Sequence, residues 1–187
     1  MTTCVLEPYI DEIVDLLNAE FDRFGGVMPE LHLIGWQAYL MTEVIDHVDY
    51  EKVRQFLPNL EDDPGALNPV HAIGIGKHYF EHDPSIPEGE CLYETEFEGL
   101  SRKIGQDKKH FGGALPPGFT VAWSGKLLGL HDCNEITDHE YEQLKAMLPE
   151  LEGNPVKEVE ALTRKYVAGG SGSDKIPYVS EVRESQS

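Results

Sequence analysis

The chain has 187 residues, of which 34 are acidic and 15 basic, so its formal net charge is −19. A field of this sign repels nucleic acid and anionic lipid, which excludes direct nucleic-acid and membrane-surface binding and favours basic protein partners or cations. No apolar run approaches 18 residues, so we expect no membrane span.

We also expect a cytoplasmic protein. The three cysteines, Cys4, Cys91 and Cys133, are widely separated and odd in number, which argues against a disulfide framework. The first residues contain no basic segment followed by an apolar one, so we predict no secretory signal.

The N-terminal third is predicted to be helical. Apolar residues recur every three or four positions between residues 8 and 24, and Gly25-Gly26 would end this helix. A second helical pattern covers residues 29–48, and a short helix at 49–56 is expected to follow.

The middle of the chain is predicted to form strands. Residues 70–76 are rich in β-branched residues and glycine, and residues 90–98 alternate between two faces. Residues 119–130 fit a hairpin that turns at Ser124-Gly125.

Two helices are predicted near the C-terminus. Thr137 and Glu140 have the spacing of a capping box, and Ile136 and Tyr141 that of a hydrophobic staple, which indicates a helix over residues 136–148. Asn154 is the predicted cap of a last helix that ends before Gly169-Gly170.

This order of elements predicts an α+β fold. It would have N-terminal helices, a central, mainly antiparallel sheet with a hairpin, two C-terminal helices and a tail. We expect one α+β domain over residues 1–167, with a possible helical subdomain at 1–63, and a flexible C-terminal tail at 168–187.

The acidic excess is greatest in the N-terminal third, where residues 1–63 contain 14 acidic and 3 basic residues. Carboxylates on the outer faces of helices could bind a basic partner, and their spacing could imitate DNA phosphates. The alternatives are a merely solvated face or a high-salt adaptation. The candidate partner-binding residues are Asp11, Asp15, Glu20, Asp22, Glu43, Asp46, Asp49 and Glu51.

The sequence also contains one cluster of basic residues. Residues 101–118 are predicted to form a loop that carries Arg102, Lys103, Lys108 and Lys109. Such a loop could bind an anion or dock on the acidic face of another copy; the alternative is a solvated loop.

The tail contains a small apolar group formed by Ile176, Tyr178 and Val179. It is predicted to be frayed or to dock by adding a strand to a partner's sheet; a third alternative is that residues 169–173 are an artificial linker.

Two histidine groups are candidates for chemistry. His71, His78 and His82 lie close together in the sequence and could bind a divalent metal. Cys133, beside His131 and His139 at the start of a helix, could form a nucleophilic pair, although its spacing does not require one.

No nucleotide-binding, hydrolase or zinc-protease motif is present, so the leading hypothesis is a non-enzymatic protein that binds a basic protein surface. That partner could be a nucleic-acid-binding protein, which this chain would inhibit by imitating DNA charge. The alternatives are a structural subunit of a homo-oligomer or larger assembly and a metal-dependent enzyme that uses the His71 cluster. We expect no cofactor under the leading hypothesis.

Overall fold

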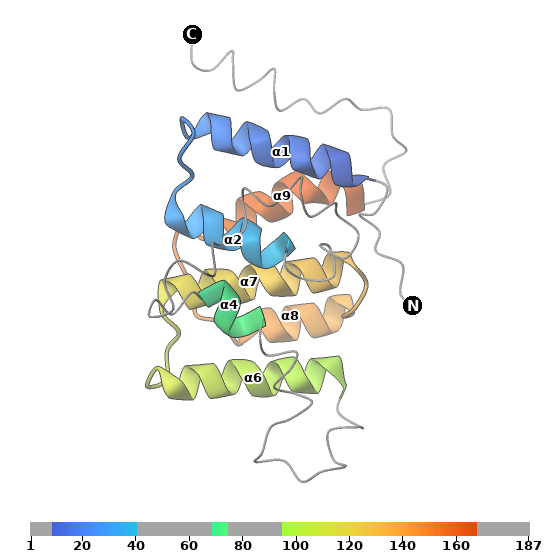
Figure 1. Cartoon of the computed structure of the whole chain (residues 1–187). Coiled ribbons are helices and arrows are strands. Elements are labelled where there is room, and N and C mark those ends of the chain that lie inside the picture. Colours follow the sequence, from blue (N-terminus) through green and yellow to red (C-terminus); the bar gives the residue numbers. More distant parts are fainter. Residues whose placement is uncertain (1–8, 41–68, 75–94, 168–187) are drawn as a thin grey trace.

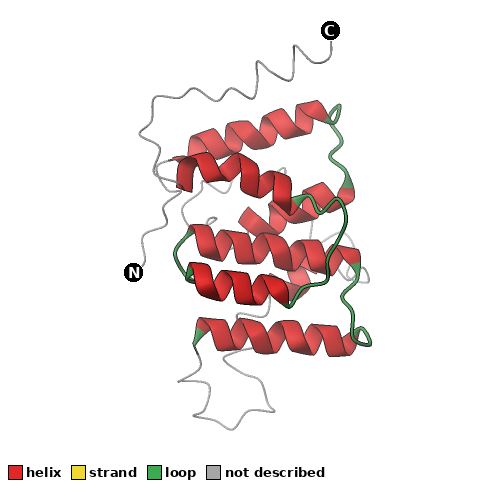
Figure 2. Cartoon of the chain, turned by 180° about the vertical axis from the view of Figure 1, so that it is seen from behind, coloured by secondary structure: helices red, strands yellow, loops and turns green. Residues whose placement is uncertain are grey.

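The structure is a computed structural model, and it describes residues 9–40, 69–74 and 95–167. These residues form a stack of helices without a strand (Figure 1; Figure 2). In chain order the helices are α1 (Ile10–Arg23), α2 (Glu30–Leu40), α4 (Pro69–Gly74), α6 (Glu96–His110), α7 (Pro117–Asp132), α8 (Asp138–Ala146) and α9 (Val156–Val167).

The predicted α+β fold with a central sheet is therefore wrong for the described residues. The strand expected at 70–76 is replaced by α4, and the hairpin expected at 119–130 lies entirely inside α7. Of the strand expected at 90–98, residues 96–98 begin α6, and residues 90–94 lie outside the described part.

Helix α7 is the centre of the stack, packing against α2, α4, α8 and α9 (Figure 1). Apolar residues lie on every side of this helix, and the Trp123 and Leu127 side chains are fully buried. An apolar sequence without a polar face is typical of a helix that is covered all round, and periodicity alone does not separate such a helix from buried strands.

Ser124 and Gly125, which we expected to form a turn, have structural roles inside α7. The Ser124 hydroxyl donates a hydrogen bond of 2.7 Å to the Thr120 carbonyl one turn earlier. Gly125 lies against α2, where an added Cβ would be only 2.6 Å from the Gly35 carbonyl oxygen. The two central helices therefore approach closely because both positions lack a side chain.

Helix α6 begins with a capping box. Thr95 accepts a hydrogen bond from the Glu98 backbone N–H, and the Glu98 carboxylate accepts one from the Thr95 N–H. The predicted basic loop at 101–118 is thus wrong at residues 101–110, which continue the helix, and at residues 117–118, which begin α7. Trp123 joins α6 to α7 by donating a hydrogen bond of 2.9 Å to Asp107.

The terminal helices of the prediction are confirmed where they are described. Helix α1 ends before Gly25 and Gly26, which both adopt positive φ, and Thr137 with Glu140 forms the predicted capping box of α8. Asn154 caps α9 by accepting a hydrogen bond of 3.1 Å from the Val156 N–H. The expected tail at 168–187 and the helix at 49–56 lie outside the described residues. Among the described helices, none is both long and apolar enough to cross a membrane.

Candidate functional site

The outer face of α1 carries exposed carboxylates. Asp11, Asp15 and Asp22 are separated by four and seven residues, which places them on one side of a helix with 3.6 residues per turn. All three are exposed, and the helical rise separates the first from the last by about 16 Å. We call these three residues the α1 acidic face.

Glu20 does not belong to this face. It lies half a helical turn away, in the middle of the apolar side of α1, and is only 1% exposed. Its carboxylate forms an ion pair of 2.7 Å with Arg23, and Arg23 also lies 3.1 Å from the Glu158 carboxylate of α9. Glu20 therefore helps to join α1 to the rest of the protein and is not available to a partner.

Several candidate residues lie outside the described part of the chain. These are the acidic residues Glu43, Asp46, Asp49 and Glu51, the metal candidates His78 and His82, and the tail residues Ile176, Tyr178 and Val179. His71 belongs to α4, but its side chain is not described. Within residues 9–40, 69–74 and 95–167, no three His, Cys, Asp or Glu side chains are grouped to hold a metal ion.

The four basic candidates lie on α6 and have two kinds of environment. Lys103 forms an ion pair of 3.2 Å with Asp107, and Lys108 donates a hydrogen bond of 3.0 Å to the Met147 carbonyl at the end of α8. Arg102 is half-buried and Lys109 is exposed. Lys108 therefore joins α6 to the end of α8, whereas the Lys103 ion pair lies within α6.

His131 is held between two carboxylates at the end of α7. Its Nε2 lies 2.7 Å from Asp138, its Nδ1 lies 3.5 Å from Asp132, and its ring stacks on Tyr141 with the centroids 4.6 Å apart. The Asp132 carboxylate, and secondly Asp138, raise the pKa of His131 above its ordinary value, while partial burial opposes this shift.

This geometry does not support a nucleophilic pair at Cys133, which the sequence offered only as a candidate. Both ring nitrogens of His131 face carboxylates, His139 is exposed, and the Cys133 side chain is 1% exposed. The buried position also keeps the thiol away from solvent and reagents.

Asp132 is the centre of a buried polar network that joins three helices. Tyr39 of α2 donates a hydrogen bond of 3.0 Å to its carboxylate, and Thr163 of α9 donates one of 3.5 Å. Burial, followed by the nearby Asp132 charge, raises the pKa of Tyr39 well above its ordinary value. Tyr39 therefore stays protonated and acts as a permanent donor to Asp132.

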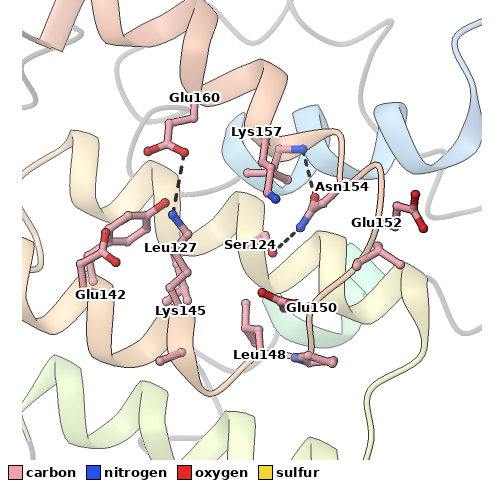
Figure 3. Close-up of a pocket in the computed structure, with 15 residues that line it drawn as sticks. Ser124, Leu127, Glu142, Lys145, Leu148, Glu150, Glu152, Asn154, Lys157 and Glu160 are labelled. Atoms are coloured by element: carbon pink, nitrogen blue, oxygen red, sulfur yellow. Dashed lines mark hydrogen bonds and ion pairs between the residues drawn. The ribbon is translucent and has the colours of Figure 1, made fainter.

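A cleft of about 620 Å³ opens between α7, α8, α9 and the loop that joins α8 to α9 (Figure 3). Its apolar walls include Leu127, Leu148, Leu151 and Val156. Its charged residues are Glu142, Lys145, Glu150, Glu152, Lys157 and Glu160.

Polar contacts fix one end of the cleft. The Asn154 amide donates a hydrogen bond of 3.2 Å to the Ser124 hydroxyl, while the Asn154 carbonyl caps α9. Across the cleft, Lys145 lies 3.9 Å from Glu160 and 5.2 Å from the centre of the Tyr141 ring. Burial is the main reason that the pKa of Tyr141 is raised, so its hydroxyl also stays protonated.

No protein-family model, curated protein or solved structure matches the chain. The function must therefore be argued from the α1 acidic face, the cations of α6 and the cleft.

The cleft was not predicted from the sequence. Its wall includes Ser124, which the sequence placed in a hairpin turn, and its charged residues lie within residues 142–160, in α8, the following loop and α9. The one signal in the sequence that could have indicated the cleft lies in the loop from Pro149 to Asn154. Two glutamates there flank a leucine, and the segment has no helical period.

Proposed function

We propose that the protein is a non-enzymatic, cytoplasmic interaction protein that binds a basic surface of another protein. The observation that carries this proposal is the α1 acidic face, where three exposed carboxylates share one side of a helix in a chain of net charge −19. Such a face attracts and orients a basic surface, and its effect on association weakens as salt increases.

Imitation of DNA needs more charge than α1 provides. A duplex carries one phosphate charge for every ~1.7 Å of its axis, or about ten charges over the ~16 Å of the α1 acidic face. Three carboxylates supply less than a third of these. A nucleic-acid mimic would therefore need Glu43, Asp46, Asp49 and Glu51 beside α1, and these residues lie outside the described part.

The test compares two variants of equal net charge. Asp15→Asn with Asp22→Asn removes two charges from the α1 acidic face, whereas Glu181→Gln with Glu184→Gln removes two charges from the last ten residues of the chain. Asp11 is kept because a carboxylate in the first turn of a helix stabilises the helix. Each full-length variant is used to capture proteins from lysate at about 50 mM and about 500 mM salt, which shortens the screening length severalfold.

We expect the native chain to capture basic proteins, including nucleic-acid-binding ones, at low salt and to release them at high salt. Loss of the two α1 charges should weaken capture by about fivefold, at roughly 0.5 kcal/mol per exposed charge. The control variant should behave like the native chain. Equal capture by both variants at low salt would refute the role of the α1 acidic face.

A second candidate function is a subunit of a homo-oligomer, and the positions of α1 and α6 favour it. These helices lie at opposite ends of the stack (Figure 1; Figure 2), and Arg102 and Lys109 on α6 are not fully buried. Contact between α6 of one copy and α1 of the next would be head-to-tail, which gives rings or open filaments.

Light scattering over a range of protein concentrations tests this assembly. We expect the mass to rise with concentration at low salt, and to rise less for the Asp15→Asn, Asp22→Asn variant. A constant monomer mass at every concentration would count against assembly.

A further inference from the structure

The cleft combines apolar walls with carboxylates that have no cationic partner among the residues that the structure describes. Glu142 and Glu150 are exposed, and neither forms an ion pair with any residue in the described part of the chain. In Figure 3 the Glu150 side chain points into the cleft, whereas that of Glu152 points away from it. Leu148 and Leu151, which are half-buried, line the cleft on either side of Glu150 in the sequence.

Contacts within the cleft already neutralise some of its charges. The charges that remain identify the side of the cleft that is open to a ligand. Lys145 is engaged by Glu160 and by the Tyr141 ring. Lys157 belongs to the first turns of α9, on the other side of the cleft from α8. A cation that enters is therefore attracted to the α8 side, at Glu142 and Glu150, and is repelled from Lys157.

We propose that the cleft binds a lysine or arginine side chain presented on an amphipathic segment of the basic protein partner. This inference rests on the proposed function and deepens it, because it names the part of the partner that is recognised. The aliphatic stem of the side chain would lie along the half-buried Leu148, while its charged head would meet Glu150. Apolar neighbours on the same segment would cover Leu151.

The dimensions and charge of the cleft fit this occupant. Its volume of about 620 Å³ lies within the ~300–1,000 Å³ of typical ligand sites, which is enough for one long side chain and an apolar neighbour. Four glutamates and two lysines give the lining a negative balance that an anionic or purely apolar segment would not match.

The experiment uses the full-length protein and a defined probe. The probe is an amidated amphipathic peptide of leucine and lysine, about 14 residues or four helical turns long. A second peptide, in which glutamine replaces every lysine, is the control for purely apolar docking. Binding is measured by titration calorimetry at low and high salt.

Two single substitutions should have opposite effects on lysine-peptide binding. Glu150→Gln should weaken it by about twofold at low salt, and Lys157→Gln should strengthen it by a similar or smaller factor. Both effects should shrink at about 500 mM salt because screening is stronger. The glutamine peptide should bind more weakly and respond to neither substitution.

Several outcomes would overturn the proposal. One is no binding of the lysine peptide, and another is binding that neither substitution changes. A third is binding that occurs only after Ile176→Asp and Tyr178→Asp are introduced, which would make the chain's own tail the occupant of the cleft.

The α1 acidic face provides the control that separates the two proposals. The Asp15→Asn, Asp22→Asn variant should bind the lysine peptide like the native chain, although it captures fewer basic proteins. If instead this variant loses peptide binding and Glu150→Gln does not, then basic segments bind at α1 and the cleft inference fails alone.

Discussion

The crossing of α2 and α7 at Gly35 and Gly125 makes a strong prediction for one small substitution. Gly125→Ala adds a single Cβ, which would lie 2.6 Å from the Gly35 carbonyl oxygen, 3.0 Å from the Ala38 Cβ and 3.2 Å from the Tyr39 nitrogen. Two of these three neighbours are backbone atoms, so no side-chain rotation relieves the contact. The two helices must move apart.

The magnitude follows from two opposing effects. Overpacking of a well-packed core costs about 1–3 kcal/mol, and contact with backbone places this case at the upper end. Alanine gains about 1 kcal/mol over glycine in a helix interior. The net loss of unfolding free energy should thus be about 2 kcal/mol, or about 4–8 °C in Tm for a chain of this size.

Gly105→Ala is the matched control, because Gly105 is also inside a helix but an added Cβ would meet nothing within 4 Å. This variant should gain up to about 1 kcal/mol. Gly35→Ala should fall between the two, since its added Cβ would meet side-chain methyl groups at 3.3 and 3.4 Å. Urea unfolding measures all three, and a Gly125→Ala variant as stable as the native protein would refute the tight crossing.

Three other substitutions test the polar contacts. Tyr39→Phe removes a 3.0 Å hydrogen bond from the buried Asp132 carboxylate and should lower the unfolding free energy by about 1–3 kcal/mol in urea titrations; an unchanged value would contradict the network. Thr137→Ala removes the cap of α8 and should cost about 1 kcal/mol, which thermal unfolding would detect, whereas a neutral result would mean that the cap contributes nothing. The pKa of His131 is raised in the folded protein, so its protonated form contributes stability below pH ~6.5, and this contribution disappears as pH rises through the folded pKa. The difference in stability between the native chain and the His131→Asn variant should therefore favour the native chain more at pH ~5.5 than at pH ~8.5. The change in this difference should be less than about 1 kcal/mol because the site is partly exposed. Parallel pH profiles of the two proteins would exclude the effect.

Local signals predicted the helices that have explicit ends. The Thr137 capping box and the Asn154 cap identified α8 and α9, and Gly25-Gly26 identified the end of α1. The same capping signal at Thr95 and Glu98 was missed, because residues 90–98 also alternate between polar and apolar positions. A capping box supplies hydrogen-bond acceptors to the unpaired backbone N–H groups at the start of a helix. At these residues it therefore predicts the structure better than the polar–apolar alternation does.

The fold class could not be obtained in this way because α7 has no polar face. Its Ser124-Gly125 pair has the composition of a turn, and only the position of Gly35 on another helix explains why glycine is needed there. Glu20 presents the converse case. The apolar period of α1 places residue 20 in the centre of its buried side, so the period alone could have removed it from the acidic face.

The separation of α2 and α7 along the chain has a consequence for synthesis. Both central helices are apolar on most sides, yet α2 ends at Leu40 and α7 begins at Pro117. Closing a loop of roughly 80 residues costs about 4 kcal/mol of chain entropy, so their pairing is a late event. At about 5–20 residues per second, synthesis of α2 is complete roughly 4–16 seconds before the start of α7 is made. During that interval α2 lacks the helix with which it makes its most extensive contacts in the folded protein, so the nascent chain carries an apolar segment that its main partner does not yet cover.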